Sequence, residues 1–128
     1  MPLHHTYHAG HDLIAVRAEG EVTFGDMQDT ALAVTDIPQF HEAVRVLLDF
    51  SEATRLVVNP MQMTELGLAM RSCFSERSRR AVVVPAGEMQ RIFEQYAKYA
   101  APGTMRVFSS KDTALGWLEV KGELGRVG

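Results

Sequence analysis

The chain has 128 residues, a net charge of −3, a pI of about 5.9 and a hydrophobic fraction of 46%. This length predicts one domain with a single core, which we expect to span residues 1–120, followed by a flexible tail at 121–128. An acidic balance without a basic patch argues against a nucleic-acid partner, and no apolar run is long enough to span a membrane. With no secretory leader and only one cysteine, Cys73, a cytoplasmic location is expected.

Strand and helix patterns alternate along the chain. Two short strands are expected at 4–8 and 12–19, around a turn at 9–12, and further strands at 44–50, 80–84 and 104–108. Helices are expected to begin at the Thr23–Asp26 capping box, at Asn59-Pro60, near residue 86 and at Ser110. The order ββαβαβαβα predicts an α/β fold with a small, mainly parallel five-stranded sheet, an N-terminal hairpin and right-handed crossovers.

The strands alternate in polarity. One face of each of three strands is apolar throughout, whereas the other face carries Arg17, Arg45 and Arg106 among apolar residues. Sheets covered by helices on both faces have strands that are apolar throughout. We therefore expect most helices on the apolar face, partial cover of the mixed face, and a homodimer formed through that face or through the exposed hairpin edge.

The stretch VLLDFSE (46–52) ends a buried strand on an acid and a hydroxyl. Parallel sheets bind ligands at the carboxyl ends of their strands, so Asp49, Ser51, Thr54, Arg55 and Asn59 are the candidate contacts for a partner or small ligand. Asp49 is also expected to accept a backbone N–H from the following turn. Catalysis by Ser51 is not expected, because His41 precedes a strand that Ser51 follows, which separates them by about 20 Å.

The only cluster of potential metal ligands is HHTYHAGH (4–11). Alternation along a strand separates His4 and His8 from His5, so we expect exposed histidines, no metal site and no cofactor. No glycine-rich phosphate loop is present. A non-enzymatic protein is the preferred interpretation, and an enzyme or metal-binding protein that uses these histidines or the Asp49/Ser51 edge is the alternative.

Several segments occur in a familiar order: Gly20 to Asp26, then DIPQF, VLLDFS, RRAVVV, MRVF and KDTALGWL. In this the chain resembles the bacterial SpoIIAA-like proteins, which are related to STAS domains and to the Sec14/CRAL-TRIO fold. The resemblance implies a right-handed βα superhelix and a regulatory or interaction module that docks a protein partner or small ligand. Anti-sigma-factor antagonists of the STAS group carry a phosphorylatable serine before the second helix. Residues 55–61 contain neither serine nor glycine, so no phosphorylation switch is expected. Lipid carriage of the Sec14 type is not expected from so short a chain.

Overall fold

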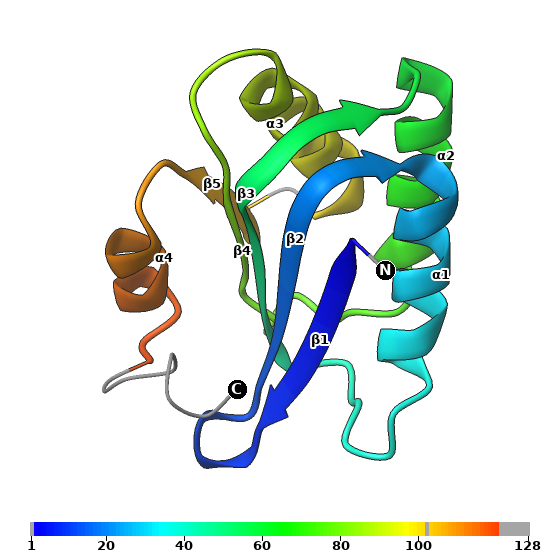
Figure 1. Ribbon diagram of the computed structural model, residues 1–128. Helices are drawn as coiled ribbons and strands as arrows, with labels where there is room; N and C mark the ends of the chain where they lie inside the picture. The colour runs from blue at the N-terminus through cyan, green and yellow to red at the C-terminus, as the bar shows by residue number, and fades with distance from the viewer. Residues whose placement is uncertain (1, 102, 121–128) are drawn as a thin grey trace.

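The computed structural model describes residues 2–101 and 103–120, which form one five-stranded sheet and the helices around it (Figure 1). The sheet order is β1-β2-β3-β4-β5, with β1 antiparallel to β2 and the other neighbours parallel. The predicted fold class and the order ββαβαβαβα are confirmed. The predicted tail at 121–128 lies outside the described residues. The elements are β1 (Leu3–His8), a 3-10 turn (Ala9–His11), β2 (Leu13–Thr23), α1 (Phe24–Thr35), β3 (Arg45–Val57), α2 (Pro60–Arg71), β4 (Arg80–Val83), α3 (Glu88–Ala100), β5 (Met105–Phe108) and α4 (Lys111–Trp117).

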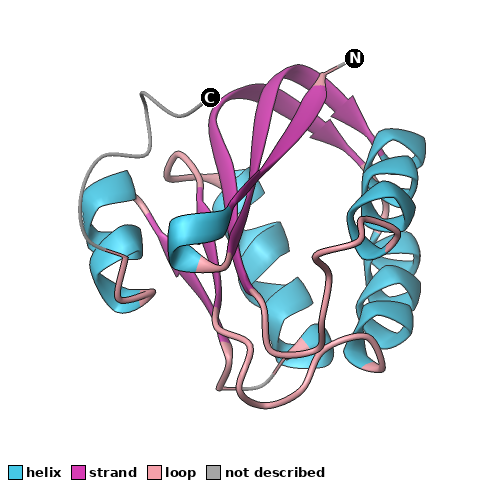
Figure 2. Ribbon diagram, turned by 90° about the horizontal axis from the view of Figure 1, so that it is seen from below, coloured by secondary structure: helices cyan, strands magenta, loops and turns pink. Residues whose placement is uncertain are grey.

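Helices lie on both faces of the sheet, but unequally (Figure 2). Helices α1, α2 and α3 cover one face and enclose the main core, in which Ile14, Val46 and Phe93 are fully or almost fully buried. Helix α4 alone packs on the other face, over a small core that includes Leu13, Leu47 and Ala114. The alternation of the strands therefore predicted correctly which face carries most of the helices.

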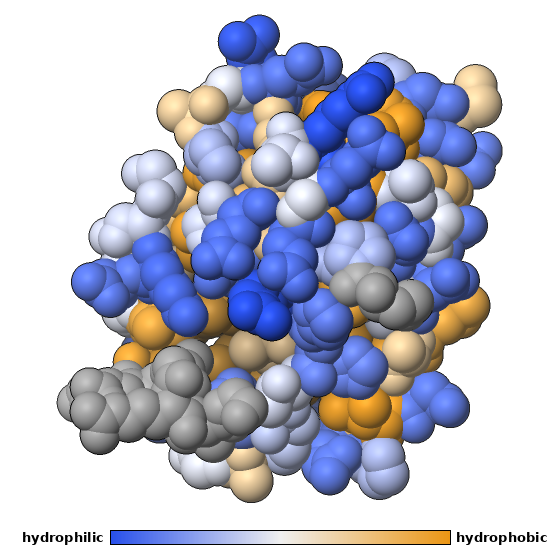
Figure 3. All heavy atoms as spheres, viewed as in Figure 1, coloured by the Kyte–Doolittle hydropathy of each residue, from blue (hydrophilic) through white to orange (hydrophobic). Residues whose placement is uncertain are grey.

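The part of the mixed face that α4 leaves uncovered is more polar than expected. Its cross-strand neighbours on β1 and β2 are His4 beside Arg17 and Thr6 beside Ala15. Seen from the β1 side, the surface is largely hydrophilic (Figure 3). Arg106 is not free, because its guanidinium lies 5.8 Å from the centroid of the Trp117 ring on α4. This face therefore lacks the apolar centre that the sequence suggested for an interface.

Strands β2 and β3 are longer than predicted. Beyond Asp49, where its pairing with β4 ends, β3 continues to Val57 and pairs only with β2. We call residues 50–57 the β3 arm. The register between β2 and β3 shifts twice in this region, and each shift places one additional residue on β3. Such bulges increase the twist of a strand pair, and the arm curls over toward α1 and α2 (Figure 1).

Capping side chains begin the two helices that follow the arm. Thr23 and Asp26 form the predicted capping box of α1, and Asn59 and Gln62 form one for α2, with Pro60 as its first residue. These side chains satisfy backbone N–H groups that would otherwise have no partner within the helix. Both helices therefore begin next to the tip of the arm.

Candidate functional site

Asp49 and Ser51 lie where the arm leaves the sheet. Ser51 donates to Asp49 Oδ1 from both its backbone N–H (3.0 Å) and its hydroxyl (2.6 Å). The expected acceptance of a backbone N–H by Asp49 is therefore confirmed. The other carboxylate oxygen lies 3.8 Å from Nζ of Lys111 on α4. These bonds stabilise the first bulge and occupy the Ser51 hydroxyl, with the candidate base His41 at the opposite end of β3.

Thr54 and Arg55 lie further along, on the arm rather than in the loop that the sequence suggested. Thr54 is exposed at the second register shift. Arg55 is also exposed and pairs with Glu21 of β2 at 3.6 Å. Both residues line a groove of about 510 Å³ between the arm and the start of α3, whose other walls include Pro85, Met89 and Ile92. The free edge of the arm and this groove lie at the carboxyl ends of β3 and β4, as predicted for the candidate contacts.

Asn59 belongs to a neighbouring surface. Its side chain caps α2, accepting from the Gln62 backbone N–H at 2.8 Å, and it lines a second groove of about 430 Å³ between α2 and α3. Two apolar side chains next to it are exposed, Val57 by 38% and Met61 by 71%. Together with the groove they form a small apolar area at the tip of the arm.

The five predicted residues are therefore divided among adjacent positions. Asp49 and Ser51 stabilise the base of the arm, Thr54 and Arg55 line its groove, and Asn59 starts α2 beyond its tip. The residues of α3 that complete both grooves, Met89 and Ile92 among them, were predicted only as parts of an amphipathic helix. Nothing in the sequence indicates that this helix lies against the arm.

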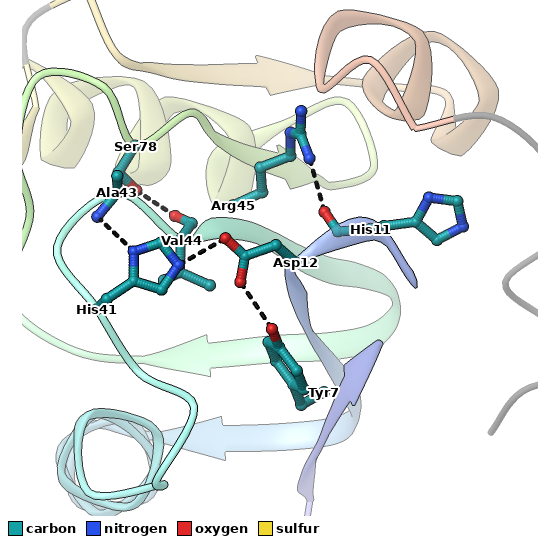
Figure 4. Close-up of polar contacts among 8 residues, drawn as sticks. All are labelled: Tyr7, His11, Asp12, His41, Ala43, Val44, Arg45 and Ser78. Carbon is teal, nitrogen blue, oxygen red and sulfur yellow. Dashed lines mark hydrogen bonds and ion pairs between the residues drawn. The ribbon is translucent and has the colours of Figure 1, made fainter. Parts of the chain in front are cut away.

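At the opposite end of the sheet, a polar cluster surrounds Asp12 (Figure 4). Tyr7 donates to Asp12 Oδ1 at 2.7 Å, and this bond is the main cause of the raised pKa of Tyr7. His41 Nε2 lies 2.5 Å from Asp12 Oδ2, while His41 Nδ1 accepts the Ala43 backbone N–H at 3.3 Å. Because Nδ1 is an acceptor, Nε2 carries the proton that is donated to Asp12. Both ring nitrogens of His41 are therefore engaged within this cluster.

Two further contacts in Figure 4 connect the same loops. Arg45 Nη1 donates to the carbonyl of His11 at 2.6 Å, and the buried Ser78 hydroxyl donates to the carbonyl of Val44. The cluster joins the hairpin turn, the segment before β3 and the segment before β4. The cluster therefore stabilises the packing of these three segments against one another.

The histidines of the hairpin differ in exposure. His4 and His5 are exposed as predicted, but His8 is only 6% exposed, which corrects the expectation that all of them lie at the surface. Burial, followed by the nearby His11 and Lys111, lowers the pKa of His8 below 6.5. Within residues 2–101 and 103–120, no group of three or more His, Cys, Asp or Glu side chains is arranged to hold a metal ion.

The fold and its edge define a class of protein: a small α/β module whose third strand extends past its neighbour. The SpoIIAA-like family model matches residues 13–119, so the chain belongs to the SpoIIAA-like family. An uncharacterized protein of the DUF3478 family from Shewanella loihica PV-4, solved by crystallography and described as having a SpoIIAA-like fold, is similar in structure. It is 25% identical, with a TM-score of 0.59 over 91% of each chain. No curated protein sequence matches the chain. Among the described helices, none has the length and apolar character needed to cross a membrane.

Proposed function

We propose that this protein is a non-enzymatic interaction module that docks an extended segment of a protein partner against the β3 arm. The observation that carries the proposal is the edge of the arm that faces away from β2. Within the described residues no strand pairs with that edge, because β4 is aligned only with Val46–Asp49. An unpaired strand edge offers a row of N–H and C=O groups that an added strand satisfies.

The groove beside the arm supports this mode of docking. Met89 and Ile92 of α3 supply apolar contacts for alternate side chains of an added strand, and Arg55 supplies a positive charge at the rim. The exposed Val57 and Met61 extend the apolar surface beyond the tip of the arm. Main-chain hydrogen bonds would give such a complex its affinity, and the side-chain contacts its specificity. The proposed docking uses backbone groups of the arm and the groove beside it, so it does not require phosphorylation of Ser51.

Selection from a displayed random-peptide library, followed by site-specific photocrosslinking, tests the proposal. A photoreactive residue replacing Thr54 is expected to crosslink the selected peptides, whereas the same residue replacing Gln28, which is exposed on α1, is not. Hydrogen exchange should show protection of amides within 50–57 when a peptide binds. Selected peptides that crosslink equally from both positions, or that leave the amides of the arm unprotected, would contradict docking on this edge.

We also infer that two copies associate through the outer edge of β1. Pro2 accepts the Glu19 backbone N–H, and because successive residues of a strand point their backbone groups to opposite sides, Leu3, His5 and Tyr7 direct theirs away from β2. A second β1 related by two-fold symmetry can pair with these groups, which would extend the sheet across the dimer.

Sedimentation at micromolar protein concentration tests this association. The wild type and His5→Ala are expected to be dimeric, since neither lacks a backbone donor. His5→Pro is expected to be monomeric because it removes an outward N–H but no bond to β2. A monomeric wild type would refute the inference.

A further inference from the structure

Arg80, the first residue of β4, is buried on the face of the sheet that α1, α2 and α3 cover. Its side chain is only 4% exposed. Nη2 donates to Thr104 Oγ1 at 3.1 Å, and the guanidinium carbon lies 4.3 Å from the centroid of the Phe74 ring. Buried arginines are uncommon, and those that occur are normally paired with an acid.

Two of the guanidinium nitrogens of Arg80 have no partner. Nε and Nη1 are both inaccessible to solvent and form no hydrogen bond. None of the ion pairs among the described residues includes Arg80. Burial lowers the pKa of Arg80, but an arginine guanidinium keeps its charge at neutral pH. The nearby Tyr96 supplies no negative charge, since burial raises its pKa to about 12.

The side chain of Arg80 lines an internal cavity of about 80 Å³ between the sheet and the helices. The other walls are almost entirely apolar and include Met27 and Val34 of α1, Leu66 of α2, Leu48 of β3 and Phe74. Leu48 lies on the central strand yet is only half-buried, as are Ala31 and Phe74 on the same cavity, so solvent reaches its mouth. The cavity thus combines an apolar wall and an opening with one buried cation at its edge, whose unused donors are not exposed to the open space.

We propose that this cavity binds a short-chain aliphatic monocarboxylate, whose carboxylate pairs with the guanidinium of Arg80 once that side chain turns its free N–H groups toward the cavity, and whose hydrocarbon chain packs against the apolar wall. A single guanidinium matches one negative charge, and hydrogen bonds between charged groups are the strong ones. A phosphate dianion would find no second cation among the lining residues. Thus the chemistry of the lining favours a monoanion with an apolar tail.

The size of the cavity limits the ligand. A volume of 80 Å³ is about two to three times the share of one water in the liquid, which fits a carboxylate with about two to four carbons and excludes a lipid chain. Most small-molecule pockets are several times larger. A ligand this small makes few contacts, and we expect a dissociation constant of about 0.1–10 mM. The inference does not rest on docking at the β3 arm, because the cavity and the groove beside the arm share no lining residue.

Titration of the full chain with sodium butyrate at constant ionic strength tests the proposal. The wild type is expected to show saturable changes in the amide NMR shifts around Val46, Phe74 and Tyr96. Its melting temperature should rise by about 5 °C at about ten times the dissociation constant. Butyramide, the neutral analogue of similar shape, should produce neither effect, and decanoate and inorganic phosphate should not compete with butyrate.

Matched variants locate the binding. Arg80→Met is expected to lose the response, and Arg106→Met, at an exposed arginine on the neighbouring strand, to retain it. Ala31→Leu fills the cavity from α1 with Arg80 in place, and it should also lose the response, which keeps the test decisive if Arg80→Met does not fold. The absence of saturable changes in the wild type would overturn the proposal. So would an equal response to butyramide, an unchanged response in a folded Arg80→Met, or binding of phosphate in preference to butyrate.

Discussion

Replacing Arg80 by methionine should make the unliganded protein more stable, although Arg80 lies in the core. Methionine has a similar length and fills the same space without a charge. The substitution removes two buried nitrogens that lack partners, and each unsatisfied buried donor costs about 1–3 kcal/mol.

The same substitution also removes two favourable contacts. The bond from Arg80 to Thr104 contributes about 1 kcal/mol and the contact with Phe74 about 1–2 kcal/mol. Thr104 is not left without a partner, because its hydroxyl also lies 3.5 Å from the carbonyl of Ala101. At the middle of these ranges the two unpaired donors cost about 4 kcal/mol and the two lost contacts contribute about 2.5 kcal/mol, so the balance is a stabilisation of about 1.5 kcal/mol. Replacement of buried charges by apolar residues has a similar effect in other proteins.

Urea unfolding measures this difference. The midpoint for Arg80→Met should move to higher urea with an unchanged slope. Arg106→Met, which changes an exposed arginine in contact with Trp117, should cost no more than about 1 kcal/mol. A loss of 1 kcal/mol or more in Arg80→Met would refute the reasoning, because it would mean that the guanidinium is well satisfied where it lies.

Three further predictions concern single positions. Asn59→Ala removes the α2 cap and should lower the free energy of unfolding by about 1 kcal/mol in urea unfolding. Gly67→Ala should raise the free energy of unfolding by about 0.5–1 kcal/mol, because alanine favours the helix and the added methyl group would lie 3.5 Å from α3, which is ordinary contact. A lower free energy of unfolding would show that α2 and α3 cannot accommodate the methyl group. Because the pKa of His8 is lowered in the folded protein, the unfolded chain takes up a proton at a higher pH than the folded one does. The contribution of neutral His8 to the free energy of unfolding should therefore be fully present above pH 6.5 and decrease as the pH falls below 6.5. Unfolding measured across this range should show a smaller decrease for His8→Phe and an unchanged one for the same substitution at the exposed His5.

The sequence predicted those helices and strands in which the spacing of apolar residues is regular from one end to the other. The capping boxes at Thr23 and Asn59 marked the starts of α1 and α2, and the alternation of Val46, Leu47 and Leu48 assigned the faces of β3. These features are local, because each depends on side chains within one or two turns of the chain. They were therefore readable without knowledge of the packing.

The β3 arm was missed for a physical reason. Each bulge shifts the two-residue alternation, so SEATRLV looks like a loop, although apart from the bulged Ser51 and Thr54 its residues are paired with β2. Gly20 was interpreted as the end of β2, but its positive φ of 69° accompanies a register shift within the strand. As a result, Thr54 and Arg55 were predicted at the correct edge of the sheet but in the wrong kind of structure.

The cavity illustrates a different limit. The positions of Val82 and Val84 on the helix-covered face indicate that Arg80, which lies two residues before Val82, faces the same way. This signal was present in RRAVVV and was hidden by the neighbouring exposed arginines. No pattern in the chain shows that the space around Arg80 remains unfilled, because that depends on how α1 and α2 lie over the sheet.

The tip of the arm lies beside the first residues of the two helices that cover the cavity. Thr23 and Val57 are paired at the tip of the arm, α1 begins directly after one and α2 begins three residues after the other. A small change of curvature at the bulges would therefore swing both helices in the same direction while each kept its own cap. If the mouth of the cavity widened in this way, one strand pair would bend at its bulges and α1 would not have to separate from α2.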